Sequence, residues 1–131
     1  MMEKLDPSVA QQIAQAATAF QQQRTGHKPK SVAVVLSGDT LLITLHGALS
    51  PAEKALAQSP EGAARLQDYH RQLFTHTADE LRQEIKRITG VEVREATAEV
   101  ETTTGTVVQV FLLARYVPAG SWSGNGVGVA S

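Results

Sequence analysis

The sequence predicts an α+β domain made of two α-β-β units. Two stretches, residues 30–47 and 91–116, alternate apolar and polar residues on both sides of a turn, as β-hairpins do. Two others, residues 5–26 and 59–90, carry apolar residues three or four positions apart, which is typical of amphipathic helices. Because each helix must bury its apolar side, we expect a four-stranded, mainly antiparallel sheet packed against an N-terminal helix and a long central helix, with a short helix between them.

The first helix is expected to begin at Asp6, whose side chain can cap it, with Pro7 in its first turn. Gly26 follows the last periodic residue and predicts the helix end. The apolar stripe consists of Val9, Ile13, Ala16 and Phe20.

The first hairpin turns at the sequence Ser-Gly-Asp, residues 37–39, whose residue types favour a tight turn. Its alternating apolar residues are Val32, Val34 and Leu36 before the turn, and Leu41, Ile43 and Leu45 after it.

Two helices should follow, one starting at Ser50 and one at Ser59, because each serine precedes a proline that suits the first helical position. Pro60 cannot donate a hydrogen bond to a preceding turn, so the chain should break or bend sharply there. Gly90 predicts the end of the long helix. The apolar stripe expected for that helix is Leu66, Tyr69, Leu73, Ala78, Leu81, Ile85 and Ile88, with Phe74 beside it.

The second hairpin has a weaker first strand, with a change of register expected near Glu95, and a stronger second strand. The alternating residues are Val93, Ala96, Ala98 and Val100 in the first strand, and Val108, Val110 and Leu112 in the second. Residues 1–116 should therefore form one domain. The remainder, residues 117–131, is rich in Gly and Ser and is expected to be a flexible tail.

Composition excludes several classes of protein. The net charge is −1 with no basic block, which argues against a nucleic-acid partner. The chain has no cysteine, and its four histidines lack the spacing of metal ligands, so we expect no metal and no cofactor. The N-terminus lacks a secretory signal, and no apolar run approaches the ~20 residues of a membrane span. We therefore expect a cytoplasmic location.

Glu53 is the residue whose role the sequence leaves most open. The sequence Ser50-Pro51-Ala52-Glu53 matches the S-x-x-E capping box, in which serine and glutamate each bind the backbone N–H of the other. That structural role is sufficient to explain Glu53. The alternative is a general base working with a histidine, for which no partner stands nearby in the sequence.

The sequence also resembles the bacterial MpsC family. The resemblance rests on "GDTLLITLHGALSPAEKALA", "YHRQLF", "IKRITGVEV" and "VQVFLLA", and it covers most of residues 8–114. The chain departs from the family in "GHKPK", where members often have Gly-x-Gly-Pro, and in its threonine-rich "ETTTG". The matching positions are Gly47, Leu49, Ser50, Pro51, Glu53, Arg71, Phe74, Thr89, Gly90 and Phe111.

The family's name refers to a sodium-translocating system that generates a membrane potential. The resemblance therefore implies a non-catalytic cytoplasmic subunit, accessory or regulatory, with an integral membrane partner. We expect a homodimer, because an open sheet face or edge invites self-association. The second hypothesis is a module that binds or senses a small anion through Arg71 and His70, without any membrane connection. The third is an enzyme that uses Glu53 with a histidine.

Overall fold

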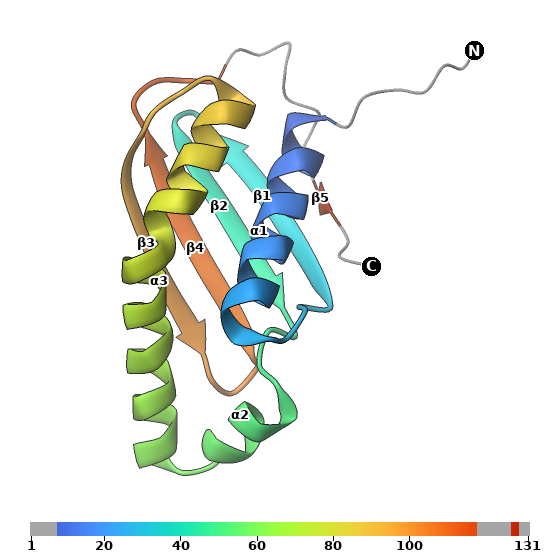
Figure 1. Ribbon diagram of the computed structural model, residues 1–131, viewed down its shortest axis with the longest axis vertical. Helices are drawn as coiled ribbons and strands as arrows, with labels where there is room; N and C mark the ends of the chain where they lie inside the picture. The colour runs from blue at the N-terminus through green and yellow to red at the C-terminus, as the bar shows by residue number, and fades with distance from the viewer. Residues whose placement is uncertain (1–7, 118–126, 129–131) are drawn as a thin grey trace, which may run out of the picture.

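The computed structural model describes residues 8–117 and 127–128. It is an α+β structure, as predicted, with both α-β-β units and the short helix between them (Figure 1). The elements, in chain order, are α1 (Val9–Thr25), β1 (Ser31–Ser37), β2 (Thr40–His46), α2 (Pro51–Leu56), α3 (Pro60–Thr89), β3 (Val93–Glu101), β4 (Thr106–Leu113) and β5 (Val127–Gly128).

The strands form one antiparallel sheet in the order β3-β4-β2-β1-β5. The four long strands are the predicted sheet, and β5 adds a two-residue strand that the sequence did not predict. It pairs with Val32 and Ala33 of β1. Most of the predicted flexible tail, residues 117–131, lies outside the described residues. Val117, at its start, is described and is buried in the core.

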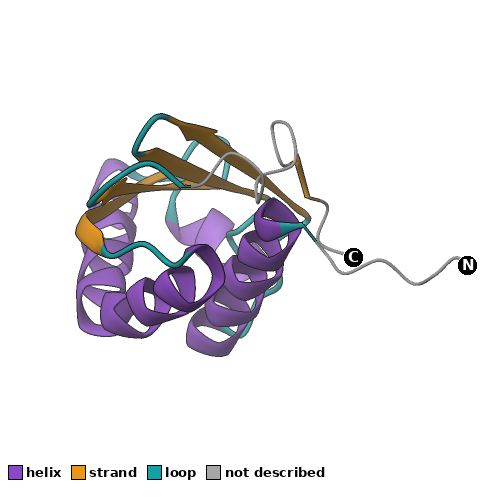
Figure 2. Ribbon diagram, turned by 90° about the horizontal axis from the view of Figure 1, so that it is seen from above, coloured by secondary structure: helices purple, strands orange, loops and turns teal. Residues whose placement is uncertain are grey.

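The two units are arranged symmetrically. The second strand of each hairpin, β2 or β4, lies in the middle of the sheet, and these two strands pair with each other in antiparallel fashion. The helices α1 and α3 lie side by side in opposite directions (Figure 1) and cover the same face of the sheet (Figure 2). A twofold axis perpendicular to the sheet, between β2 and β4, would give this arrangement.

The core lies between the helices and the covered sheet face. In β1 and β2 the buried residues are largely those predicted, for example Val34 and Ile43. In β4 the prediction was wrong. The buried residues are Val107, Gln109, Phe111 and Leu113, and the predicted residues Val108, Val110 and Leu112 lie on the opposite face of the sheet. Both faces of β4 are apolar in sequence, so pairing with β2 and β3 decides which one is covered.

Most helix ends agree with the prediction. Gly26 and Gly90 end α1 and α3 in the left-handed conformation. The start of α1 differs, because Ser8 rather than Asp6 is the N-cap and forms a capping box with Gln11. Asp6 and Pro7 lie outside the described residues. The predicted register change in β3 is present as an irregularity between Val93 and Glu95.

The predicted break at Pro60 separates α2 from α3. Ser59 caps α3 by accepting a hydrogen bond from the N–H of Gly62 at 3.0 Å. A Cβ atom at Gly62 would lie only 1.8 Å from the carbonyl oxygen of Leu56, so the sharp turn between the helices requires glycine there. This close approach lies at the turn from α2 into α3, and the two helices contact each other.

Candidate functional site

Glu53 caps α2 as predicted. Its Oε1 accepts a hydrogen bond from the Ser50 N–H at 2.9 Å, and the Ser50 Oγ accepts one from the Glu53 N–H at 3.2 Å. Pro51 stands at the first helical position, where its missing N–H leaves no hydrogen bond unmade. Glu53 therefore belongs to a complete capping box.

The other carboxylate oxygen of Glu53 binds a histidine on the next helix. Glu53 Oε2 lies 2.8 Å from Nε2 of His70, and the two side chains are only 17% and 7% exposed. Burial raises the pKa of Glu53, but the hydrogen bonds from Ser50 and His70 outweigh it, so its pKa lies below the ordinary value. Glu53 thus joins the start of α2 to the N-terminal half of α3.

The predicted stripe of α3 is largely buried, but it contained Tyr69 in place of His70, and the contact between Glu53 and His70 was therefore not predicted. Tyr69, expected in the apolar stripe, is 50% exposed, whereas His70 faces the sheet. The observed buried residues follow mainly a spacing of four: Gly62, Leu66, His70, Phe74, Ala78, Leu81, Ile85 and Thr89. The signal was available, since His70 lies four residues from both Leu66 and Phe74.

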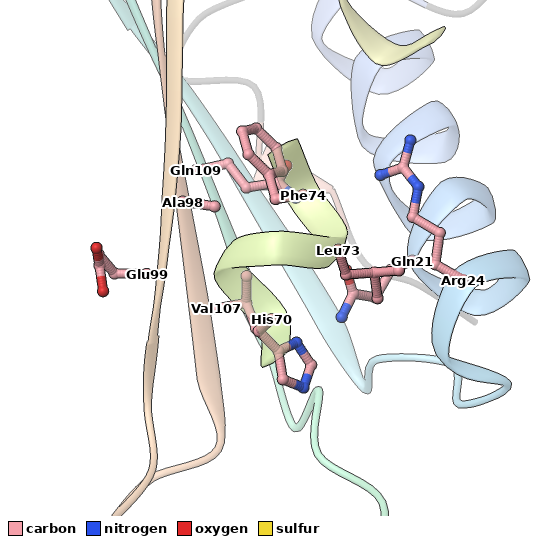
Figure 3. Close-up of a pocket in the computed structure, with 9 residues that line it drawn as sticks. All are labelled: Gln21, Arg24, His70, Leu73, Phe74, Ala98, Glu99, Val107 and Gln109. Carbon is pink, nitrogen blue, oxygen red and sulfur yellow. The ribbon is translucent and has the colours of Figure 1, made fainter. Parts of the chain in front are cut away.

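His70 also borders a partly open cavity lined by residues of α1, α3 and the β3–β4 hairpin (Figure 3). The centre of a water-sized molecule has about 20 Å³ there. One water needs about 10–15 Å³ on this measure, so the cavity has room for one or two water-sized groups. Its lining residues are Gln21, Arg24, His70, Leu73, Phe74, Ala98, Glu99, Val107 and Gln109.

Three polar side chains of this lining contain buried atoms that lack a hydrogen-bond partner in the described part of the chain. The atoms are Gln21 Nε2, Arg24 Nε and Gln109 Oε1. Gln21 and Gln109 are only 5% and 2% exposed. An unpaired buried polar group typically costs about 1–3 kcal/mol, so three around one cavity need an explanation.

Arg24 places a positive charge beside the cavity. Its side chain is 8% exposed, its Nη2 donates to the Thr77 carbonyl oxygen at 2.6 Å, and its guanidinium lies over the Phe20 ring. The Glu80 carboxylate is 4.0 Å away and largely exposed. Burial lowers the pKa of Arg24 below its ordinary value, and Glu80 partly offsets this.

The structure does not bring Arg71 and His70 into one cavity. The Arg71 side chain is exposed, and two of its nitrogens donate to the carboxylate oxygens of Glu99, at 2.9 and 3.3 Å. These hydrogen bonds raise the pKa of Arg71. Figure 3 shows the Glu99 carboxylate pointing to the opposite side of β3 from the buried residues of the lining. The sequence-predicted pair is therefore one buried residue and one surface residue.

The two glycines singled out by the sequence serve backbone geometry. Gly47 has φ 60° at the end of the first hairpin, and a Cβ there would lie 2.7 Å from the side chain of Lys30. The carbonyl oxygen of Gly47 also lies 3.1 Å from Nε2 of His27. Gly90 has φ 76° and open space around it. Both positions favour glycine because of their left-handed conformation.

Two further observations concern metal sites and membrane-spanning helices. Among the described residues, no group of three or more His, Cys, Asp or Glu side chains is placed to hold a metal ion. None of the described helices combines the length and apolar character needed to cross a membrane.

Comparison with known proteins identifies one family. The family model described as "Na+-translocating membrane potential-generating system (MpsC)" matches residues 6–115. A relative from Bacillus subtilis (strain 168), described as "Uncharacterized protein YbcI", is 28% identical over 112 residues, which cover 86% of this chain and 90% of that protein. No solved structure matches the chain.

Proposed function

This chain belongs to the MpsC family, and on that premise we propose that it is a non-catalytic cytoplasmic subunit, accessory or regulatory, of a membrane system that moves ions or generates a potential. One observation carries the proposal: the family match spans residues 6–115, almost all of the described domain. The whole fold, rather than an isolated motif, is therefore what the family shares. An integral membrane protein is the partner that such a role requires.

The uncovered face of the sheet supports a role in binding other proteins. Val35, Leu42 and Val110 stand in one row across β1, β2 and β4, on the face that no helix covers (Figure 2). Val35 is exposed, and its two neighbours are partly exposed. Apolar side chains gathered on a surface are typical of interaction sites. We assign this face to a homodimer of the chain.

The surroundings of Glu53 support a non-catalytic role. Both of its carboxylate oxygens are engaged, one by the Ser50 N–H and one by His70. As a general base, Glu53 would have to give up a bond that holds α2 or α3 in place. The contact between Glu53 and a histidine is the one feature that favours the enzyme hypothesis, and its position inside a helix cap favours the structural reading.

The geometry gives less support to an anion site shared by Arg71 and His70. The Arg71 guanidinium already has a carboxylate partner in Glu99, and the Nε2 of His70 is bound to Glu53. An anion at either residue would compete with a carboxylate that the chain itself supplies.

A membrane pull-down tests the proposed function. An affinity-tagged copy of the chain, expressed at its natural level, is cross-linked in cells and purified from detergent-solubilised membranes. We expect at least one integral membrane protein to co-purify in fixed ratio, and to be lost when the tag is placed on an unrelated α+β domain of similar size. Recovery of the chain with no integral membrane protein would contradict the proposal.

A further inference from the structure

We propose that the cavity between α1, α3 and the β3–β4 hairpin is a binding site for a small oxyanion, contacted by Arg24, Gln21 and Gln109. Glu99 borders the cavity, but its carboxylate pairs with Arg71 and points away from the buried residues of the lining (Figure 3). The proposed site does not depend on the membrane role, because it rests on the cavity alone.

The first argument is the concentration of unpaired polar atoms. Four buried side-chain nitrogen or oxygen atoms lack a partner in the described residues, and three of them belong to residues that line this cavity. They come from two elements, with Gln21 and Arg24 on α1 and Gln109 on β4. Buried polar groups in folded proteins nearly always have partners. A ligand in the cavity would supply the missing ones.

The second argument is charge. Among the residues that the structure describes, the carboxylate paired with the buried guanidinium of Arg24 is that of Glu80, which is 4.0 Å away and mostly in solvent. Its close partners are the neutral carbonyl of Thr77 and the ring of Phe20. A buried arginine with unused donor capacity is suited to carboxylate and phosphate groups. The charge of the ligand should therefore be negative.

The third argument is the chemistry of the lining. Arg24 Nε and Gln21 Nε2 can only donate, so the ligand must present oxygens to them. Gln109 Oε1 accepts, which suits a protonated oxygen of the ligand, or its amide can turn over and donate instead. The apolar part of the wall consists of Leu73, Phe74, Ala98 and Val107.

The fourth argument is size. About 20 Å³ for the centre of a water-sized molecule admits one or two water-sized groups and excludes a nucleotide or an aromatic cofactor. The class that meets all four requirements is the smallest carboxylate-type oxyanions, of which formate is the simplest.

Thermal unfolding with and without anions tests the site. Sodium formate, acetate, phosphate and sulfate are each compared with sodium chloride at equal ionic strength. We expect at least one oxyanion to raise the melting temperature above the chloride value along a curve that saturates at millimolar concentration, since ligand at ten times its Kd raises the folding equilibrium constant about 11-fold. The general stabilising effect of sulfate and phosphate salts does not saturate in this range. If no oxyanion does so, the proposal is overturned.

Three variants locate the effect. Arg24→Gln removes the charge, and Gln109→Leu replaces an unpaired amide by an apolar side chain of similar size. Both should lose the anion-dependent shift. Arg71→Gln, which removes a guanidinium outside the buried site, should keep it. Gln109→Leu should fold well, because removing an unsatisfied buried amide does not break any hydrogen bond. Retention of the shift in Gln109→Leu, or its loss in Arg71→Gln, would contradict the assignment.

Nitrogen-15 NMR gives a direct reading of the contacts. Titration of the stabilising oxyanion should move the Arg24 Nε–H and Gln21 side-chain amide signals with one common Kd, while the Arg71 Nε–H signal stays in place. Movement of the Arg71 signal without that of Arg24 would overturn the proposal.

Discussion

At the scale of single residues, the pairing of Glu53 with His70 gives a helix cap a second role. One carboxylate oxygen closes the start of α2 and the other fixes a buried histidine of α3. A glutamate that only capped its helix would be replaceable by other capping residues. This one also positions the wall of the polar cavity, because His70 lies in its lining.

The free energy of unfolding should depend on pH through Glu53. Its folded-state pKa lies below the ordinary value of 4.5, so its ionised form stabilises the fold above about pH 4.5, and this contribution is lost as the pH falls through the folded pKa. Glu53→Gln keeps a capping side chain but cannot ionise. We expect the stability advantage of the wild type over Glu53→Gln to shrink below about pH 4.5 in urea unfolding. An equal difference at pH 3.5 and pH 6 would contradict this role of the carboxylate.

A double-mutant cycle should measure the strength of the Glu53–His70 contact. We expect a coupling of about 1–2 kcal/mol for Glu53→Ala with His70→Ala, because a charged hydrogen bond between nearly buried side chains is stronger than one in solvent. The matched control is Arg71→Ala with Glu99→Ala, an exposed ion pair that should couple by less than about 1 kcal/mol. Equal coupling energies in the two cycles would contradict the expectation that the buried pair is the stronger contact.

At the scale of elements, the junction between α2 and α3 is what brings Glu53 and His70 together. The two residues are 17 positions apart in sequence. The break at Pro60 and the close backbone approach at Gly62 lie at the turn from α2 into α3. The contact between Glu53 and His70 therefore depends on the turn between α2 and α3 as well as on the two side chains.

Two glycine substitutions distinguish the stability cost of a steric clash from the cost of a left-handed backbone conformation. Gly62→Ala should destabilise strongly, by about 3 kcal/mol or more, because its Cβ would overlap the Leu56 carbonyl. Gly90→Ala should cost only about 1–2 kcal/mol, since a Cβ there meets open space and suffers only from the left-handed conformation. Chemical unfolding measures both, and a smaller loss for Gly62→Ala than for Gly90→Ala would contradict the account of the junction.

The sequence predicted local features well and long-range ones poorly. The capping box at Ser50, the break at Pro60 and the register change near Glu95 follow from chemistry between neighbouring residues, and the structure contains all three. On the buried side of α3 the sequence misplaced one position, because Tyr69 and His70 both fit a helical stripe and only the packing of the folded chain decides between them. The cavity could not be predicted, since Gln21 and Gln109 meet only after folding.

At the scale of the whole molecule, the two faces of the sheet differ, because helices pack on only one of them (Figure 2). Both long helices cover a single face of the sheet (Figure 2), and the other face carries apolar residues from three neighbouring strands. The partly exposed row of Val35, Leu42 and Val110 is the apolar part of this face.

The proposed homodimer can be tested on the open face. Val110→Lys places a charge in the middle of this face, where a second copy would bring a like charge close to it. We expect analytical ultracentrifugation to show a dimer for the wild type and a monomer for Val110→Lys. Leu56→Lys, on α2 and away from the sheet face, should remain dimeric. A monomeric wild type at all concentrations would exclude the dimer.

The role proposed for the chain is to serve a membrane potential-generating system without catalysing a reaction. The most direct measurement is the membrane potential of cells, read with a voltage-sensitive dye in sodium-containing medium, after deletion of this chain and after its return. We predict that deletion lowers the potential, and that both the wild type and a folded Glu53→Gln variant restore it. A potential unchanged by deletion would contradict the membrane role, and failure of a folded Glu53→Gln variant to restore the potential would contradict the non-catalytic role.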